Sequence, residues 1–220
     1  MNYSKYIDHT LLKADAVESQ FDTLCEEAKS YDFKSVCVNP GRVAYCSKKL
    51  VESDVLVCTV IGFPLGATST ESKVFEAAQA LKDGADEFDM VLNIGKLKEK
   101  NLEYVTMEIA AVKEAVGEKI LKVIIETCLL TDEEKVLACD CVIQGHADFV
   151  KTSTGFSTGG ATVDDVALLY RSVKGRALVK AAGGVRNRDD LKAMIDAGAS
   201  RIGTSGGVKL MQGEKSEGNY

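Results

Sequence analysis

Two lysines stand where apolar segments of the chain end, and their amino groups could do covalent chemistry. Lys151 follows Phe149 and Val150 in "FVKTSTGFS", and Lys180 interrupts the apolar run in "ALVKAAGG". Lysine is among the residues that are least often fully buried, so a lysine in each apolar segment needs a reason. A neutral amine attacks a carbonyl carbon whereas an ammonium group does not, and a Schiff base forms in this way.

The two lysines can influence each other if their segments are neighbouring strands of one sheet. Side chains alternate along a strand, so both lysines can face inward, with ammonium groups roughly 5–6 Å apart. At an effective dielectric constant of about 20, the two charges repel by roughly 3 kcal/mol. Repulsion then lowers the pKa of one lysine from about 10.4 to about 8, and burial acts in the same direction. The alternative is that each lysine only pairs with a carboxylate, Asp89 or Glu126.

The rest of the chain alternates short apolar runs with amphipathic segments. We predict helices over residues 71–84, 102–117, 131–145, 162–175 and 187–198. We predict strands over residues 6–9, 33–38, 55–61, 87–92, 120–126, 147–152, 177–181 and 200–203. This count and spacing favour an α/β fold of the (β/α)8 TIM-barrel type, as one domain over residues 1–220 with a short N-terminal segment.

An open, doubly wound sheet is the structural alternative, but it normally has fewer strands and a glycine-rich turn after the first one. Here "IDHTLLKAD" follows the first predicted strand and contains no glycine. Residues 211–220, "MQGEKSEGNY", are polar, and we expect a flexible tail there. Helix starts are marked by Thr131 with Glu134, by Thr162 with Asp165, and by Asn187. Glycines mark the expected helix ends, at positions 84, 117, 145, 175 and 198.

In a barrel of this type the active site lies at the C-terminal ends of the strands. Polar or reactive side chains fall at these ends, namely Asp8, Thr10, Cys37, Asp89, Glu126, Lys151 and Lys180. Asp89 is the better candidate for proton transfer because it lies nearer the strand end than Glu87. Cys37 alone would usually be core filling, and we expect His9 to be a hydrogen-bonded structural residue.

Glycine-rich turns follow the last two strands and point to an anion. One turn contains Gly183 and Gly184 with Arg186 close behind, and "GTSGG" at residues 203–207 supplies Thr204 and Ser205. Loops at these two positions commonly hold a phosphate in this fold. Outside a barrel both motifs would be weak, since neither is a P-loop or a dinucleotide fingerprint.

Composition excludes several classes of partner. The net charge is −6 and the pI is near 5.1, so we expect neither a nucleic-acid nor an anionic-membrane surface. Apolar runs of about eight residues are too short to span a membrane. The seven cysteines contain no CxxC pair and no secretory signal opens the chain, so we expect reduced thiols and a cytoplasmic protein. His9 and His146 are not at metal-ligand spacing, and we expect no metal.

Taken together, several motifs resemble the deoxyribose-phosphate aldolases, which are class I aldolases. The motifs, in chain order, are "IDHTLLKAD", "SVCVNP", "DEFDMVLNIG", "LKVIIET", "FVKTSTGF", "VKAAGGVR" and "GASRIGTSGG". The resemblance implies reversible cleavage of 2-deoxy-D-ribose 5-phosphate to D-glyceraldehyde 3-phosphate and acetaldehyde, without a cofactor. Two alternatives remain: another lysine-dependent aldolase with a different phosphorylated sugar, and a phosphosugar-binding barrel without catalysis. A homo-oligomer, dimer or tetramer, is compatible with the sequence.

The resemblance also implies roles for individual residues. Lys151 would be the Schiff-base nucleophile, with Lys180 perturbing it and Asp89 in the proton relay. The implied substrate-binding residues are Asp8, Thr10, Cys37, Thr152, Gly183, Gly184, Ser205 and Gly206. The chain departs from the pattern at Phe156, where some members have a lysine that helps bind phosphate. Some members also use a C-terminal tyrosine, which here would be Tyr220.

Overall fold

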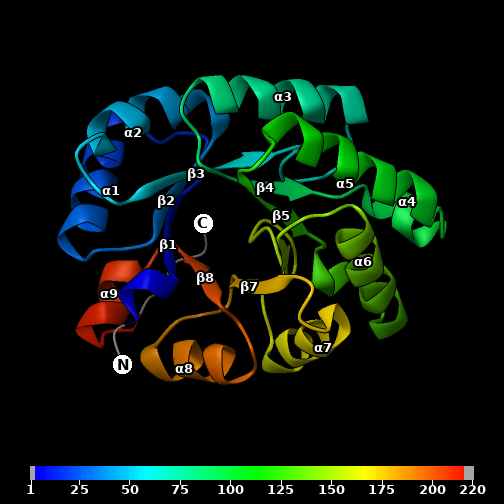
Figure 1. Ribbon diagram of the computed structural model, residues 1–220. Coiled ribbons are helices and arrows are strands. Elements are labelled where there is room, and N and C mark those ends of the chain that lie inside the picture. The colour runs from blue at the N-terminus through cyan, green and yellow to red at the C-terminus, as the bar shows by residue number, and fades with distance from the viewer. Residues whose placement is uncertain (1–2, 216–220) are drawn as a thin grey trace.

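A computed structural model describes residues 3–215 of the chain. Within them, parallel strands pair in sequence order, and the last pairs with the first to close a barrel (Figure 1). The strands are β1 (Ile7–Leu11), β2 (Ser35–Val38), β3 (Leu56–Ile61), β4 (Glu87–Val91), β5 (Ile120–Ile124), β6 (Phe149–Lys151), β7 (Leu178–Ala182) and β8 (Arg201–Thr204). The predicted TIM barrel is therefore confirmed, with each strand within a few residues of its expected bounds.

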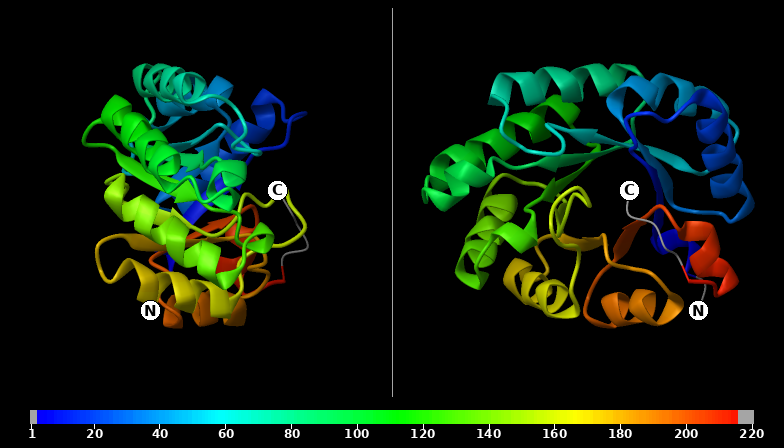
Figure 2. Two further views of the ribbon diagram at one scale, coloured as in Figure 1. Left: turned by 90° about the vertical axis from the view of Figure 1, so that its right-hand side faces the viewer. Right: turned by 180° about the vertical axis from the view of Figure 1, so that it is seen from behind.

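Helices pack around the outside of the barrel, as the end-on and side views show (Figures 1 and 2). They are α1 (Glu18–Ser30), α2 (Val43–Leu50), α3 (Thr70–Lys82), α4 (Ile94–Lys98), α5 (Leu102–Val116), α6 (Asp132–Gln144), α7 (Val163–Val173), α8 (Arg188–Asp196) and α9 (Gly207–Gln212). Three short 3-10 turns, η1 (Ser4–Tyr6), η2 (Pro40–Arg42) and η3 (Thr127–Leu129), join them. In the described part of the chain, no helix combines the length and the apolar character that crossing a membrane requires.

The predicted helix starts are confirmed by their hydrogen bonds. The Thr131 hydroxyl accepts from the N–H of Glu134 in a capping box, and Asn187 accepts from the first turn of α8. One glycine does not behave as expected: Gly145 has φ −80°, and the following His146 takes the left-handed conformation at φ 59°. Met211 and Gln212 belong to α9 rather than to a tail, because the helix continues to Gln212. The end of the expected tail, 216–220, lies outside the described residues.

The apolar core lies between the strands and the helices, as expected for parallel strands covered on their outer face. Inside the barrel, the usual branched aliphatic layers are partly replaced by buried acidic and basic side chains. The strand register brings these charged side chains together. Lys151 is the register partner of Lys180 across β6 and β7, and Asp89 is the register partner of Lys122 across β4 and β5. Side chains at paired positions of neighbouring strands point to the same face, which here is the interior.

Candidate active site

A network of buried charges fills the barrel interior. It consists of Asp8, Glu87, Asp89, Lys122, Lys151, Lys180 and Arg201, which we call the charge cluster; none of these residues is more than 5% exposed. Each comes from the inward face of a strand, so the closed sheet brings residues from distant parts of the chain together. Burial on this scale is tolerated only because every charge has an opposite partner.

Asp89 is the residue of the charge cluster that contacts all three lysines. Its Oδ2 accepts from Lys151 Nζ at 2.7 Å and from Lys180 Nζ at 2.7 Å. Since both nitrogens contact one oxygen, they are separated by no more than twice that distance, as the lysine spacing predicted. Its Oδ1 accepts from Lys122 Nζ at 2.8 Å and from the Cys58 thiol at 3.2 Å. Asp89 is therefore saturated with donors on both oxygens.

Asp8 and Arg201 complete the network from the side of β1 and β8. Asp8 Oδ2 accepts from Lys180 Nζ at 2.5 Å, and Asp8 Oδ1 accepts from Arg201 at 2.7 Å and from the Ser35 hydroxyl at 2.7 Å. Arg201 also binds Glu87 through both of its terminal nitrogens. Asp8 therefore holds Lys180 from the side opposite to Asp89.

These contacts set the ionisation of the cluster. Burial opposes charge on Lys180, but Asp8 and Asp89 outweigh it and raise the pKa of Lys180 above its usual range. Burial likewise opposes charge on Asp89, yet Lys122, Lys151 and Lys180 hold the pKa of Asp89 well below its usual range. From the sequence we expected repulsion between the two lysines to lower one pKa, with pairing to Asp89 or Glu126 as the alternative. The structure adds the carboxylates, which keep Lys180 a cation.

The charge count favours one neutral amine. With every group ionised, the cluster has four cations and three anions, and releasing one proton balances it. Lys180 contacts two carboxylates and Lys122 contacts Glu87 and Asp89, whereas Lys151 contacts Asp89 alone. Lys151 therefore has the fewest carboxylate partners of the three lysines. This arrangement suits Lys151 for attack on a carbonyl.

The loop after β6 is fixed by hydrogen bonds rather than left free. Thr154 donates its hydroxyl to Glu126, a buried residue in the left-handed conformation at φ 55°, and its N–H also points to that carboxylate. The Thr152 hydroxyl bonds the backbone of Ala182 on β7, donating at 3.3 Å and accepting at 3.1 Å. The Thr152 hydroxyl thus links the segment that follows β6 to the end of β7.

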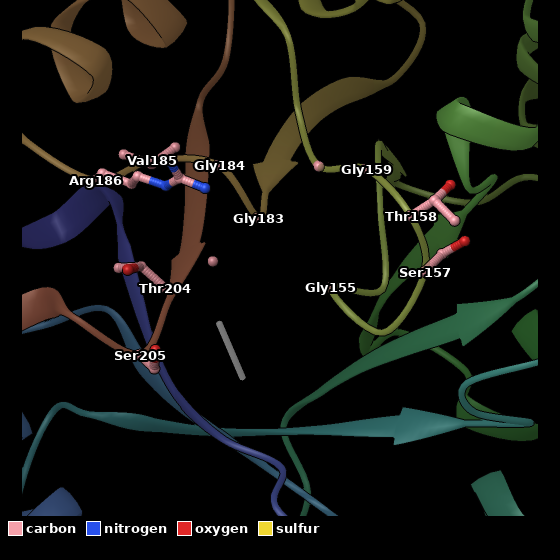
Figure 3. A pocket seen from close by; sticks show the side chains of 12 residues that line it. Gly155, Ser157, Thr158, Gly159, Gly183, Gly184, Val185, Arg186, Thr204 and Ser205 are labelled. Atoms are coloured by element: carbon pink, nitrogen blue, oxygen red, sulfur yellow. The ribbon is translucent and has the colours of Figure 1, made fainter. Parts of the chain in front are cut away.

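A small cavity of about 130 Å³ lies between the loops after β6, β7 and β8 (Figure 3). Gly183, Gly184 and Ser205 line it, as the glycine turns predicted, and Arg186 adds a guanidinium group. Gly206 is not among the lining residues, and its N–H donates to the Thr204 hydroxyl at 3.0 Å. The loops pack backbone to backbone, since a Cβ added to Gly160 would lie 2.6 Å from the carbonyl carbon of Gly183. Small size and polar lining suit a phosphate.

The opposite side of the barrel is apolar. Cys37 lies there with Leu12, Cys58 and Val60, and the half-buried Phe63 packs against them. The Phe156 ring meets Phe63 edge to face, with centroids 5.2 Å apart, and it is not among the residues lining the small cavity. Arg186 is the residue with a positively charged side chain among those that line the cavity.

Two residues of β1 have local roles. The Thr10 hydroxyl donates to the Asp8 carbonyl at 2.9 Å, and Thr10 borders a separate hollow against α1. His9 points outward and its Nε2 lies 2.7 Å from Glu27, which fits the structural role predicted for it. Thr10 thus supports the strand that presents Asp8.

Sequence reasoning missed Lys122 and Arg201, which are as central as the residues it named. A lysine inside the apolar run "ILKVII" is the same signal that identified Lys151, so Lys122 could have been found in this way. Ser153 was also missed; its hydroxyl is buried and has no hydrogen-bond partner among residues 3–215. Cys37, Cys58 and Asp89 approach within 4.8 Å of one another, but the ammonium groups already on Asp89 disfavour a metal cation, and we assign none.

Comparison with known proteins agrees with this geometry. Residues 3–212 match the family model described as DeoC/LacD family aldolase. The chain is 60% identical over 220 residues, all of both proteins, to a deoxyribose-phosphate aldolase of Streptococcus uberis. It is 59% identical over 213 residues to one of Finegoldia magna, covering 97% of this chain and 100% of that one. A tetrameric deoxyribose phosphate aldolase from Aeropyrum pernix is 34% identical and superposes with a TM-score of 0.87, covering 95% of this chain and 89% of that one. The chain belongs to the DeoC/LacD family of aldolases.

Proposed function

We propose that this aldolase cleaves 2-deoxy-D-ribose 5-phosphate reversibly to D-glyceraldehyde 3-phosphate and acetaldehyde, with a Schiff base on Lys151. The observation that carries the assignment is the position of Lys151 in a buried cluster whose charges balance when one amine is neutral. Full-length relatives that bear the name of this activity support the choice of substrate.

The chemistry begins with attack of the neutral Lys151 amine on the C1 aldehyde. Loss of water gives an iminium ion, which withdraws electrons from the C2–C3 bond. Removal of the proton from the C3 hydroxyl breaks this bond, releasing the three-carbon phosphate and leaving a two-carbon enamine on Lys151. Protonation of the enamine at C2 and hydrolysis then release acetaldehyde and restore the amine.

Proton transfer falls to Asp89 and Lys180. Asp89 Oδ2 contacts both amines at 2.7 Å, so a proton that leaves Lys151 can pass along this oxygen to the neighbouring groups. Lys180 stays charged because Asp8 and Asp89 surround it. Its ammonium group can therefore donate a proton to the reacting intermediate, with Asp89 as the shared hydrogen-bond partner. Asp8 acts as the positioning residue that holds Lys180 against Asp89.

The phosphate would occupy the small cavity beside the barrel mouth. Gly183, Gly184 and Ser205 line it with neutral groups, and Arg186 offers a guanidinium group. This cation could bind the phosphate in place of the lysine that some family members have at the position of Phe156. The two-carbon fragment would then lie toward Cys37 and Phe63 on the apolar side. One end of the mouth would thus hold an anion and the other a methylene group.

Borohydride trapping tests the proposal. Reduction in the presence of acetaldehyde should convert one lysine to N-ethyllysine, a net gain of C2H4, and peptide mapping should place it on Lys151. Lys151→Ala should lose both the adduct and the activity, whereas Lys192→Ala, an exposed lysine on α8, should keep both. Absence of an adduct with wild type would favour a binding barrel without catalysis. An adduct without acetaldehyde release from the deoxy sugar would favour an aldolase for another phosphorylated sugar.

We further propose a cytoplasmic enzyme that forms a homo-oligomer. All seven cysteines are free thiols, which a reducing compartment maintains. The tetramer reported for the Aeropyrum pernix protein supports assembly. Light scattering at several protein concentrations would give the assembly state.

A further inference from the structure

Two cysteines face each other on the inner wall of the barrel, beside the charge cluster. Cys37 on β2 and Cys58 on β3 are register partners in neighbouring parallel strands, and both point into the barrel. Their Sγ atoms and one carboxylate oxygen of Asp89 lie within 4.8 Å of one another. Neither thiol is more than 1% exposed, so the pair lies inside the site rather than on the surface.

The backbone spacing permits a bond between the two sulfurs. Neighbouring strands lie about 4.8 Å apart, which falls within the Cα separation of roughly 4.4–6.8 Å that disulfides span. The two thiols are on the same face at the same level. Rotation of the two side chains can therefore bring the sulfurs together without a change of register.

The two thiols differ in reactivity. The adjacent Cys58 thiol lowers the pKa of Cys37 against burial and the Asp89 carboxylate, which raise it, and Lys180 and Lys151 also lower it. The Cys58 thiol donates its hydrogen to Asp89 Oδ1, and burial, together with the Cys37 thiol and the Asp89 carboxylate, raises the pKa of Cys58 well above its usual range. Cys37 is thus the nucleophile of the pair, and Cys58 keeps its proton and can react second.

We propose that Cys37 and Cys58 form a modification site, a dithiol that a hydroperoxide oxidises to a disulfide, and that the disulfide inhibits the aldolase reaction. The Cys37 thiolate attacks one peroxide oxygen, which breaks the O–O bond and gives a sulfenic acid and hydroxide. Cys58 sulfur then attacks the sulfenic sulfur, forms the S–S bond and releases water. In sum, two thiols lose two electrons and two protons, and hydrogen peroxide becomes two waters.

Inhibition follows from the contact between Cys58 and the charge cluster. The Cys58 thiol donates to Asp89 Oδ1 at 3.2 Å, and its sulfur lies 3.3 Å from Lys122 Nζ. A disulfide has no hydrogen to donate, so Asp89 loses this partner while it still binds both lysines of the site. We expect kcat/KM to fall by about tenfold or more, the scale of one lost hydrogen bond to a charged group.

Access to the pair rests on the proposed function. A substrate aldehyde must reach Lys151, whose Nζ is 2.7 Å from the carboxylate that neighbours Cys37. Hydrogen peroxide is smaller than any such aldehyde, so the same opening admits it. The intact-mass readout below needs no catalysis, and it therefore separates failure of this inference from failure of the aldolase assignment, which borohydride trapping reports.

The experiment treats the full chain with hydrogen peroxide, blocks remaining thiols with N-ethylmaleimide, and records intact mass, non-reduced peptide maps and activity. We expect a loss of two hydrogens, a Cys37–Cys58 peptide, and an activity loss of about tenfold or more that dithiothreitol reverses. Cys58→Ala and Cys58→Ser should lack the cross-linked peptide and the reversible loss, each judged against its own untreated activity. Cys46→Ala is the matched control, because Cys46 neighbours Cys25 in a second buried pair between α1 and α2.

Every other outcome overturns the proposal. Oxidation confined to Cys128, the exposed cysteine, would show that peroxide does not reach the pair. A reversible loss that persists in both Cys58 variants, or disappears in Cys46→Ala, would place the sensitive thiols elsewhere. A Cys37–Cys58 peptide with full activity would refute inhibition.

Discussion

Replacing Lys122 by methionine tests whether the charge cluster is ionised in the folded protein. Lys122 is fully buried, and its Nζ lies 2.8 Å from a carboxylate oxygen of Glu87 and 2.8 Å from one of Asp89. At an effective dielectric constant of about 20, each pair attracts by roughly 6 kcal/mol. Most of that attraction offsets the desolvation of the charges, so removal of one partner should cost about 3–5 kcal/mol of unfolding free energy.

The same substitution should move the pH–rate profile. After burial, which acts the other way, Lys122 is the largest influence on Asp89, and it lowers the pKa of Asp89. Without it the pKa of Asp89 rises, the carboxylate takes up a proton at higher pH, and the acid limb of kcat/KM shifts upward. Urea unfolding followed by circular dichroism gives the stability, and a pH series of acetaldehyde release gives the profile.

Lys135→Met is the matched control for this prediction. Lys135 also contacts two carboxylates, Asp132 at 2.9 Å and Asp165 at 2.6 Å, but it lies outside the barrel between α6 and α7 and Asp132 is exposed. Lys135 and Asp165 are mostly buried, so the loss of Lys135 should also lower stability, but it should leave the pH–rate profile unchanged because Lys135 lies outside the barrel. An equal shift of the profile in the two variants, or a Lys122→Met change below about 1 kcal/mol with an unchanged acid limb, would refute the reasoning.

Three further predictions follow from the cavity and from the charge cluster. Arg186→Met should raise KM for the phosphorylated sugar by about tenfold, the scale of one lost charged hydrogen bond, and should change cleavage of unphosphorylated 2-deoxyribose less than about twofold; equal effects on both substrates would remove Arg186 from phosphate binding. Gly160→Ala should destabilise the protein by about 1–3 kcal/mol and raise the same KM, because the added Cβ would lie 2.6 Å from the backbone of Gly183. Gly41→Ala is the control and should do neither, since a Cβ there has nothing within 4 Å. Unfolding titrations measure the stability of both variants, and steady-state kinetics measure KM. The pKa values of Asp8 and Asp89 are lowered on folding, so their contribution to stability is present above about pH 4 and is lost as pH falls through the folded values; urea midpoints that stay flat from pH 6 to about pH 3 would contradict this.

Much of the fold could be predicted because its signals are local. Apolar runs, helix caps and glycine stops are properties of a few neighbouring residues, and they gave eight strands in the right order. Gly145 shows the limit of such rules, since the next residue, His146, makes the left-handed turn instead. Local sequence sets where an element ends to within a residue or two, and packing selects the residue that turns.

The candidate site was predicted in part, for a physical reason. Lys151, Lys180 and Asp89 could be named because each is a charged residue in an apolar run, although only Lys151 ends its strand; Lys180 and Asp89 lie in the middle of β7 and β4. The partners of these residues depend on register around a closed sheet: Arg201 on β8 meets Glu87 on β4 across the barrel. Repulsion between two lysines could be worked out from their spacing, but compensation by three buried carboxylates could not.

The charged interior of the barrel links the stability of this enzyme to its catalytic rate. The buried charged side chains around Lys151 also fill the space that aliphatic side chains occupy in other barrels. If the proposed mechanism holds, a substitution in the charge cluster should lower the rate per molecule and also raise the fraction of unfolded molecules that proteases remove. The same seven positions would then determine both the activity and the abundance of the enzyme.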